Sequence, residues 1–387
     1  MPQHRFTSIH VVGTNGKSSV TEMTAALLEA HGRRAGAYLS PHTIRWSERV
    51  RIGGAEIDPD RFAVAAERVA QSVTAVNRTL ADGESVTQFE AATAVAFVAL
   101  AAAGVEFGVI EAGLGGRLDA TNVLPSLATA LTSVGLEHTE WLGDTVEEIA
   151  GEKLAVLRDH STLVLGRVPP SVRKLAERTA AEHNARLVVA SDPADLRLAV
   201  PGAYARRDFA VSIAAAEAGL GALDEARVRA VAEGLELPGR MQVLSGSPPM
   251  VLDAAHNPDG ARALAEALPE AIGDRPVVVC IAMLGDKDAA GVVEALAPLV
   301  ALAVCTELPP ERLARVGRPG ARAMAASRLA EVATAAGLEA EAILEPGAAL
   351  RRGLALAKER GGVALVCGSH YLLQDAWTER HDPSSSR

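Results

Sequence analysis

The stretch SIHVVGTNGKSSVTEM, residues 8–23, decides the fold of the first half of this chain. Its apolar run at residues 9–12 breaks into GTNGKS at residues 13–18, and apolar side chains then recur at helical spacing to residue 31. A strand, a glycine loop and a helix in this order form the context that a phosphate-binding loop requires. The common G-x-x-x-x-G-K-[ST] spacing is not met, since Val11 stands where its first glycine would be. The stretch therefore predicts a nucleotide phosphate site of a variant form.

The loop has a plainer interpretation as a turn, because short Gly-Lys-Ser matches also occur by chance. The strand before it and the helix after it favour the phosphate site. We expect the loop amides to hold phosphate, Lys17 to neutralise it and Ser18 to ligate Mg²⁺. The residues predicted to bind the nucleotide here are Gly13, Thr14, Asn15, Gly16, Lys17, Ser18 and Ser19.

Length and composition restrict the fold and the partners. A chain of 387 residues suggests two domains, and 49% apolar with only 3% aromatic residues suits Ala-rich helices on Val-rich strands, an α/β protein. The net charge of -10 argues against nucleic-acid or anionic-membrane partners and leaves small molecules. No signal region and no apolar run of spanning length is apparent, so a cytoplasmic protein is expected. Its three cysteines, Cys280, Cys305 and Cys367, lie in apolar runs and predict buried thiols.

Strands and helices alternate along the whole chain, which implies mainly parallel sheets. In the first half we predict helices at 90–103, 145–158 and 209–221 and strands at 107–111 and 128–134. Asp144 with Glu147 resembles a capping box at the start of the second of these helices.

The punctuated stretch LPGR at residues 237–240 marks the predicted domain boundary, giving domains 1–240 and 241–387, the second with a disordered tail at 381–387. Strands are predicted at 250–253, 276–283, 302–306 and 363–367, and helices at 258–268, 289–296, 321–336 and 347–359. This series predicts a smaller doubly wound, Rossmann-like domain.

Two groups at the carboxyl ends of strands are candidates for a metal site. Glu111 ends one strand and His138 follows another that we take as its neighbour, and ligands bind at this edge of an α/β sheet. Either residue alone has a plain interpretation as a turn or surface group. Together with Ser18 they supply oxygen and imidazole ligands where the metal of a nucleotide would lie.

Lys153 is one of only five lysines in the chain. It lies four residues after Ile149 and four before Leu157, so helical spacing places it on an apolar stripe. Its stem could pack there while the ammonium stays in water. A desolvated lysine would instead have a lowered pKa and be open to chemical change. The sequence leaves both interpretations open.

The second half also has polar groups at a strand end. Asp253, His256 and Asn257 fall within five positions just before a helix that starts with proline, which favours a nucleotide or substrate contact over simple turn residues. Residues 286–288, Asp-Lys-Asp, repeat the theme, although a solvated charged turn explains them equally well.

An ordered set of motifs resembles folylpolyglutamate synthases and dihydrofolate synthases of the Mur ligase superfamily. The motifs are HVVGTNGKSS, SPHTIRWSERVRIGG, EAGLGGRLDATN, EHTEWLG, EIAGEKLAVLR, PGR, LDAAHNP and MLGDKD, from about residue 8 to 290, with weaker similarity to the GSHYL near the end. The resemblance implies a P-loop NTPase-like domain followed by a Rossmann-like ligase domain. It also implies ATP-dependent ligation of L-glutamate to dihydropteroate or a reduced folate, through an acyl phosphate.

The resemblance assigns roles to individual residues. Ser18, Glu111 and His138 would hold one or two Mg²⁺ ions, and Lys153 matches a lysine that the family carbamylates. Arg240 and His256 would contact phosphates, and Asp253 the ribose. Lys17, Lys153, His138 and His256 would act in catalysis. The residues expected to line the substrate cleft are Ser40, Pro41, His42, Arg45, Arg49, Gly115 and Arg117. A monomer is expected.

The chain departs from the family pattern in three places. Only residues 1–8 precede the first strand, so the family's extended N-terminal helix is largely missing. Glu137 stands before His138 where the family usually has Asp. Asp208 stands where an Asn is expected to read adenine, and Asp accepts a hydrogen bond from the adenine N6 group but donates none.

Two other functions compete with folate ligation. A Mur-type ligase acting on a cell-wall nucleotide peptide is disfavoured, because no UDP-binding segment precedes residue 8. A ligase-like nucleotide-binding protein that has lost catalysis is conceivable from the altered segment at residues 204–208. The intact set of Ser18, Glu111, His138 and Lys153 argues against it.

Overall fold

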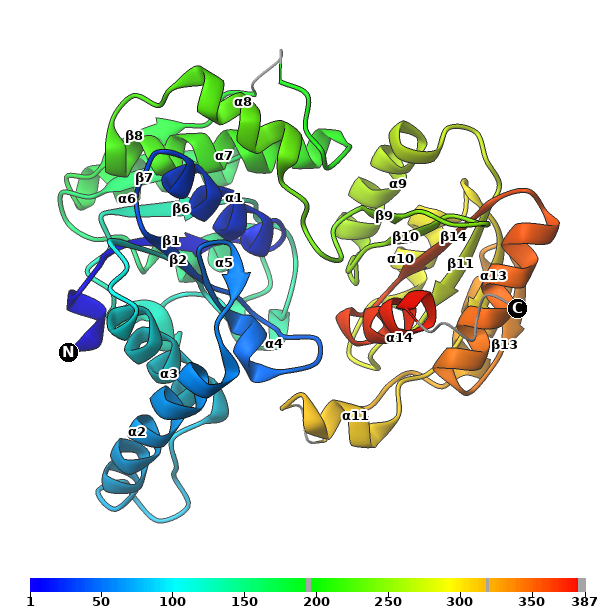
Figure 1. Ribbon diagram of the computed structural model, residues 1–387, viewed down its shortest axis with the longest axis horizontal. Coiled ribbons are helices and arrows are strands. Elements are labelled where there is room, and N and C mark those ends of the chain that lie inside the picture. Colours follow the sequence, from blue (N-terminus) through cyan, green and yellow to red (C-terminus); the bar gives the residue numbers. More distant parts are fainter. Residues whose placement is uncertain (193–195, 318–319, 382–387) are drawn as a thin grey trace. The chain divides into compact units, whose positions relative to one another are not determined.

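A computed structural model describes residues 1–192, 196–317 and 320–381 (Figure 1). The chain divides into two compact units. Unit 1 comprises Met1–His42, Trp46–Ala199 and Ala205–Leu235, and unit 2 comprises Thr43–Arg45, Val200–Tyr204 and Glu236–Arg387. Each unit has its own sheet and its own core. No helix among the described residues is long and apolar enough to cross a membrane.

Unit 1 is built on an eight-stranded sheet in the order β4-β3-β2-β5-β1-β6-β7-β8. Only β3 and β4 run antiparallel to their neighbours. The strands are β1 Thr7–Val12, β2 Ala35–Tyr38, β3 Val50–Ile52, β4 Ala55–Glu56, β5 Phe107–Glu111, β6 Ala128–Leu131, β7 Thr162–Leu165 and β8 Arg186–Val189. β1 lies between β5 and β6 and is buried over its last five residues, as expected for a parallel strand covered on both faces.

Helices cover this sheet and close its core. They are α1 Lys17–Ala30, α2 Pro59–Asn77, α3 Gln88–Ala102, α4 Thr139–Leu142, α5 Val146–Leu154, α6 Pro170–Glu182, α7 Ala203–Leu220 and α8 Glu225–Gly234, with short 3-10 turns η1 Pro2–His4, η2 Trp46–Arg49 and η3 Ala120–Val123. α1 packs on β2 and β5, and α5 and α6 pack together beside β7. Ile149 and Leu154 of α5 are buried with Leu131 of β6 in one hydrophobic cluster.

Three predicted element bounds in unit 1 were wrong. The capping box at the start of α5 pairs Thr145 with Glu148, one residue later than predicted, because Thr145 and not Asp144 accepts from the N3 amide. α5 ends at Leu154, four residues before the predicted end. α7 begins at Ala203, so Asp208 lies within the helix and not ahead of it.

Unit 2 contains a six-stranded sheet in the order β13-β12-β11-β14-β10-β9. Its strands are β9 Gln242–Leu244, β10 Met250–Leu252, β11 Val277–Ile281, β12 Val300–Cys305, β13 Glu339–Ala342 and β14 Val363–Cys367, with β9 antiparallel to β10. The helices are α9 Pro258–Ile272, α10 Ala289–Leu296, α11 Pro310–Arg315, α12 Ala326–Ala335, α13 Pro346–Glu359 and α14 His370–His381. The parallel strands and their helices give the predicted doubly wound arrangement.

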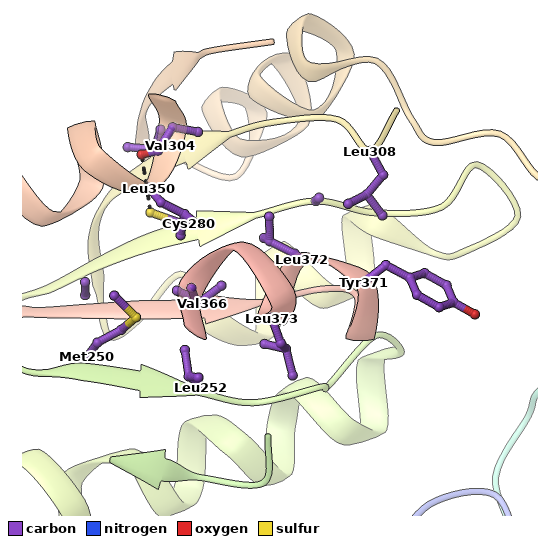
Figure 2. Close-up of a cluster of buried hydrophobic side chains, with 14 of the residues drawn as sticks. Met250, Leu252, Cys280, Val304, Leu308, Leu350, Val366, Tyr371, Leu372 and Leu373 are labelled. Carbon is purple, nitrogen blue, oxygen red and sulfur yellow. Dashed lines mark hydrogen bonds between the residues drawn. The ribbon is translucent and has the colours of Figure 1, made fainter. Parts of the chain in front are cut away.

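The core of unit 2 is apolar and contains Cys280 (Figure 2). Met250, Leu252 and Val366 lie on the strands beneath Leu373 of α14. All three cysteines are unpaired and buried, which confirms the prediction, and burial raises the pKa of the Cys280 thiol to about 12.

Two segments near the C-terminal end differ from their predicted bounds. The helix predicted at 321–336 begins only at Ala326, because Ala323 instead forms an isolated β-bridge with Leu284. α14 extends to His381, and the rest of the predicted disordered tail, residues 382–387, lies outside the described residues.

Candidate active site

The glycine loop lies at the carboxyl end of β1, directly before α1. Gly16 is the N-cap of α1 and has a φ of 83°, a conformation that favours glycine. Space also requires glycine here, because a Cβ on Gly16 would lie 2.5 Å from Oδ1 of Asp208. α1 has no acidic residue in its own first turn, although the Asp208 carboxylate of α7 lies beside its N-cap. The loop and helix end together form an anion-binding arrangement.

The segment after β6 fixes the loop. Thr14 N donates to Ser133 O at 2.9 Å, and Asn15 N donates to Ser133 Oγ at 3.0 Å. Thr132 Oγ1 donates to Asn15 O at 2.6 Å. A Cβ on Gly13 would collide with Thr132 Oγ1, so only glycine allows this approach. The loop is therefore preorganised before any ligand arrives.

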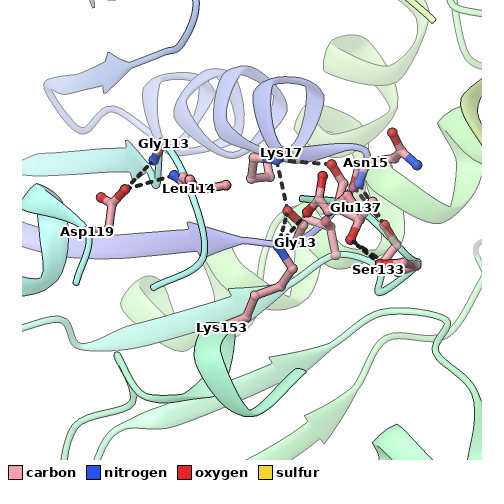
Figure 3. Close-up of polar contacts among 12 residues, drawn as sticks. Gly13, Asn15, Lys17, Gly113, Leu114, Asp119, Ser133, Glu137 and Lys153 are labelled. Carbon is pink, nitrogen blue, oxygen red and sulfur yellow. Dashed lines mark hydrogen bonds and ion pairs between the residues drawn. The ribbon is translucent and has the colours of Figure 1, made fainter. Parts of the chain in front are cut away.

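Two lysines converge on one carbonyl oxygen of this loop, and Figure 3 shows them pointing toward it from opposite sides. Lys17 Nζ donates to Gly13 O at 2.8 Å and to Thr14 O at 3.0 Å. Lys153 Nζ donates to the same Gly13 O at 3.1 Å, across 140 residues of sequence. The site thus gathers two of the five lysines at the strand end.

Lys153 is desolvated, so the interpretation with its ammonium in water was wrong. Its side chain is 1% exposed, and Nζ forms an ion pair with Glu137 Oε1 at 2.6 Å. Burial lowers the pKa of Lys153 from its ordinary value, and Lys17 adds to this, while Glu137 opposes it. Burial opposes ionisation of Glu137, but Lys17 and Lys153 outweigh it and hold the pKa of that carboxyl well below its usual range. Glu137 is therefore ionised at neutral pH and sits between two cations.

Glu111 joins the phosphate loop to the segment after β2. Its Oε1 accepts from Ser18 Oγ at 3.1 Å, and its Oε2 accepts from Ser40 N at 3.0 Å. The carboxylate is 2% exposed and lies at the end of β5. A serine hydroxyl beside a carboxylate provides the hard oxygen ligands that Mg²⁺ prefers, so Ser18 and Glu111 fit a metal ion.

His138 is placed differently from the prediction. It precedes α4 as its N-cap, with a φ of 46°. The strands that carry Glu111 and precede His138, β5 and β6, are not neighbours, because β1 lies between them. Among the described residues, no three His, Cys, Asp or Glu side chains form a ready metal-ligand cluster. Two of the three predicted ligands, Ser18 and Glu111, are in direct hydrogen-bonding contact.

The segment after Ser40 contains a buried aromatic and cationic cluster. Pro41 follows Ser40 by a cis peptide bond. The Arg49 guanidinium lies 4.7 Å from the centre of the Trp46 ring, and Arg49 Nε donates to His42 Nδ1 at 2.9 Å. Burial, with the nearby Arg49 charge, lowers the pKa of His42 to about 4. His42 is therefore neutral, and its proton lies on Nε2.

Two donors of this cluster have no acceptor among the described residues. His42 Nε2 and Arg49 Nη1 are both buried without a hydrogen-bond partner there. Leaving buried donors unpaired costs free energy, so the pair suits an oxygen supplied from outside the chain. Arg45, also predicted at the substrate, is exposed and is grouped with unit 2.

The glycine-rich loop after β5 packs on the end of α5. Gly116 must lack a side chain, because its Cβ would lie 2.6 Å from Glu152 O. Gly115 has a φ of 66°, and Arg117 Nε pairs with Glu152 Oε1 at 2.8 Å in an exposed ion pair. The loop therefore leads from the strand of Glu111 to the helix of Lys153.

In unit 2, Asp253 holds the turn that carries Arg240. Asp253 Oδ2 accepts from Met241 N at 2.9 Å, and its Oδ1 accepts from Ala255 N at 2.8 Å. Burial raises the pKa of Asp253, although Arg240 and these amides oppose the shift. Both carboxylate oxygens already serve the backbone, which is the turn role that the sequence offered as the alternative to a ligand contact.

His256 and Asn257 follow at the start of α9. His256 Nδ1 donates to Ala254 O at 2.9 Å, so the proton of a neutral ring lies on Nδ1. The rings of His256 and His370 lie 5.8 Å apart. Asn257 caps α9 by accepting from Gly260 N at 2.8 Å, so with Asp253 two of the three polar groups predicted at this edge have a structural function. Lys287, in the second charged turn, pairs with Asp286 at 3.3 Å.

Sequence reasoning missed several residues of unit 1. Ser133 and Thr132 were not singled out, although the run TSVG after β6 offered small hydroxyl side chains at a strand end. Asp119 and Thr121 were missed as well, although Asp-x-Thr is typical of a side chain that caps its own turn. No local signal identified Glu137 as the partner of Lys153.

Comparisons with known proteins agree with this geometry. The family described as "Mur ligase middle domain" matches residues 11–201, and "Mur ligase, glutamate ligase domain" matches residues 239–370. The dihydrofolate synthase/folylpolyglutamate synthase of Mycobacterium tuberculosis is 32% identical over 345 residues, covering 79% of this chain and 71% of that protein. The chain belongs to this family of the Mur ligase superfamily.

Other members of the folylpolyglutamate synthase family are similarly close. The Bacillus subtilis dihydrofolate synthase/folylpolyglutamate synthase is 31% identical over 74% of this chain and 73% of its own length. A solved M. tuberculosis folylpolyglutamate synthase complexed with ADP superimposes with a TM-score of 0.89 at 29% identity, covering 98% of this chain and 92% of that one. A Yersinia pestis enzyme complexed with AMPPNP and Mn ion gives a TM-score of 0.81 at 30% identity, covering 97% and 89%.

Proposed function

We propose that this chain joins L-glutamate to a folate-type carboxylate, dihydropteroate or a reduced folate, with hydrolysis of ATP to ADP and phosphate. As a member of its family it is an ATP-dependent acid-amino-acid ligase that uses a divalent metal ion. The observation that carries the proposal is the convergence of Lys17 and Lys153 on the phosphate loop beside the Ser18 and Glu111 contact.

The chemistry follows in two balanced steps. A substrate carboxylate oxygen attacks the γ-phosphorus of ATP, the bond to ADP breaks, and an acyl phosphate forms. The glutamate amine then attacks the acyl carbon, phosphate leaves, and the amine loses a proton. Lys17 and the first turn of α1 stabilise charge on the transferring phosphoryl group, which is the main catalytic term in such reactions.

A divalent ion, when bound, would offset the charge of the phosphates. Ser18 and Glu111 would hold it, and we propose His138 as a further ligand, for a second ion. Lys153 is proposed to add CO₂ on its neutral amine, forming a new N–C bond and releasing one N–H proton to solvent, so that the buried amine becomes a carbamate with oxygen ligands. Its lowered pKa supports this, because only the neutral amine reacts.

We further propose that His42 and Arg49 hold an oxygen of the folate substrate, since both offer a buried donor without an acceptor among the described residues. Ser40, Pro41, Arg45, Gly115 and Arg117 complete the proposed substrate set. Arg49→Lys should raise KM for the folate about tenfold, because a lysine cannot keep both the His42 contact and the second donor. Arg51→Lys is the matched control, since Arg51 instead pairs with Glu22. Equal KM values for both variants would remove this assignment.

In unit 2, we propose that Arg240 and His256 contact the phosphates and Asp253 the ribose. Asp208 is proposed to meet the adenine base. The chain is proposed to act as a monomer in the cytoplasm, which light scattering and fractionation would test.

One assay tests the ligase function. Phosphate release is measured with ATP, Mg²⁺ and glutamate, and with dihydropteroate, tetrahydrofolate or a UDP-muramoyl peptide in parallel. Release that requires a folate acceptor, with a product heavier by one glutamyl residue, supports the proposal. Release that needs no acceptor, or only the UDP-peptide, contradicts it.

A further inference from the structure

A buried hydrogen-bond chain lies under the glycine-rich loop, and none of the roles above uses it. We call it the Asp119 chain; it comprises Asp119, Thr121 and His10. Asp119 Oδ2 accepts from Gly113 N at 2.9 Å and from Leu114 N at 2.8 Å (Figure 3). Its Oδ1 accepts from Thr121 N at 2.9 Å and from Thr121 Oγ1 at 2.5 Å. One carboxylate thus fixes two loop amides on one side and η3 on the other.

His10 orients the threonine from the central strand. Thr121 Oγ1 donates its one proton to Asp119. It must therefore accept from His10 Nε2, which lies 2.8 Å away. His10 is fully buried, and burial with the Arg158 charge lowers its pKa to about 3. The His10 ring is therefore neutral near pH 7, and a proton on Nε2 lets it donate to Thr121 Oγ1. The donors therefore run from His10 of β1 through Thr121 to the Asp119 carboxylate, which also accepts from the two loop amides.

The loop that Asp119 holds connects two groups of the reaction site. Its first amide lies two residues after Glu111, at the end of β5. Its other end packs on α5, where Arg117 N donates to Glu152 O at 3.0 Å and a Cβ on Gly116 would lie 3.0 Å from Lys153 O. A shift of the loop therefore moves Glu111 and Lys153 relative to each other.

We propose that Asp119 is a positioning residue for ligation: by holding the Gly113 and Leu114 amides, it sets the separation of Glu111 and Lys153 about the phosphate loop. The inference rests on the proposed function. Asp119 touches no reacting atom and acts through the loop. An asparagine there cannot replace it, because one of its two polar ends is a donor and would face a backbone donor.

Asp119→Asn is the central variant, and Asp58→Asn is its matched control. Asp58 also accepts from two backbone amides, those of Asp60 and Arg61 at the start of α2, but contacts no loop of the site. We expect Asp119→Asn to lower kcat about 100-fold, because small misplacements cost this much. Asp58→Asn should keep kcat within about twofold.

A second pair of variants separates positioning from folding. Thr121→Val removes the hydroxyl that orients Asp119, whereas Thr121→Ser keeps it. Thr121→Val should lower kcat about tenfold, and Thr121→Ser should restore it, with the folded fraction of each measured by thermal unfolding. Loss of kcat only in proportion to loss of folded protein, or equal kcat for the two variants, overturns the proposal.

A binding measurement decides the inference even if the folate reaction fails. The affinity of AMPPNP is measured by calorimetry with Mg²⁺ and again with a chelator. Asp119→Asn should reduce the gain from Mg²⁺ about tenfold, since Glu111 is displaced, and Asp58→Asn should not. An unchanged gain overturns the positioning role. Absence of folate-dependent phosphate release by the wild-type chain, in contrast, overturns the proposed function alone.

Discussion

The two units each contain a strand that runs through a tight turn into a helix, but the two turns differ in what completes them. The first turns of helices leave amide groups that need acceptors. At the start of α9, Asn257 accepts from Gly260 N, and Pro258 has no amide proton to satisfy. At the start of α1, the N-cap is Gly16, which has no side chain to offer. The α9 turn is thus completed by the chain itself, whereas the α1 turn is built to receive an anion.

The buried carboxylates beside these turns differ in the same way. Glu137 lies between Lys17 and Lys153, and its pKa is held well below the usual range. Asp253 accepts mainly from backbone amides, and burial raises its pKa despite Arg240. The Glu137 carboxylate of unit 1 thus pairs with charged side chains, whereas the Asp253 carboxylate of unit 2 accepts hydrogen bonds from backbone amides. The following experiments test this contrast.

The largest effect is expected from Lys17→Ala. Removing the cation that we propose stabilises the transferring phosphoryl group should lower kcat/KM for ATP about 1000-fold. Lys174→Ala, on the exposed face of α6, is the matched control and should leave kcat/KM unchanged. Equal activities of the two variants in the phosphate-release assay would show that the α1 turn is not the phosphate site.

Lys153→Ala should lower kcat about 100-fold, because it removes both the Gly13 contact and the amine proposed to take up CO₂. Small carboxylates such as acetate should restore part of the activity by occupying the vacated space. Because Lys153→Ala leaves the Glu137 carboxylate without this ion pair, thermal unfolding is used to check that the variant remains folded. Full activity of the variant without added carboxylate would show that Lys153 serves packing alone. A loss of activity that carboxylates do not rescue would contradict the proposed carbamate.

Glu137→Gln should remove a pH-dependent part of the stability. A carboxyl whose folded pKa is lowered contributes stability above its unfolded pKa, and this is lost as the pH falls through the folded value. For Glu137 the window runs from its ordinary 4.5 down to about 2. The variant should therefore unfold more easily than wild type by about 2 kcal/mol at pH 7, with the gap closing below pH 4. Chemical denaturation at pH 7 and pH 3, with exposed Glu140→Gln as control, measures it; a gap that widens in acid contradicts the ion pair.

Asn257→Ala tests the other turn. Loss of the α9 cap should lower the free energy of unfolding by about 1 kcal/mol without a phosphate-loop defect. Asn257→Asp keeps the acceptor and should retain the stability. If Asn257→Ala instead left stability intact and weakened ATP binding, the α9 turn would be a ligand site like that of α1.

The smallest effect is expected from Asp208→Asn. The amide both accepts and donates, so it should lower KM for ATP by about threefold relative to the native carboxylate, provided Asp208 meets the base. Parallel KM values for ITP, which lacks the N6 amino group, serve as the control. The same change for ATP and ITP would mean that Asp208 acts on the loop at Gly16 and not on adenine.

The sequence predicts what depends on local spacing. The strand, loop and helix around Lys17 were predicted because glycines, a lysine and an apolar period occur together within a short stretch. The apolar spacing of α5 likewise placed Lys153 on the apolar stripe, but it left open whether the ammonium is solvated or buried. The capping box was displaced by one residue because Asp144 and Glu147 have the same spacing as the true pair, Thr145 and Glu148.

What the sequence does not reveal depends on strand order and on long-range partners. The insertion of β1 between β5 and β6 separates two strands that the sequence suggested were neighbours. Glu137 pairs with Lys153 only because α5 returns to the loop before α4. The Asp119 chain begins at His10, and a contact across 111 residues leaves no local pattern.

The carbonyl oxygen shared by Lys17 and Lys153 couples two events that the sequence keeps far apart. A phosphate that draws Lys17 toward itself leaves the Gly13 oxygen to Lys153 alone. Binding free energies are reciprocal, so by whatever factor the charge state of Lys153 changes nucleotide affinity, nucleotide binding shifts that charge state by the same factor. Through this one carbonyl group, the occupancy of the nucleotide site and the chemical state of Lys153 would be thermodynamically coupled, although the two lysines lie far apart in the sequence.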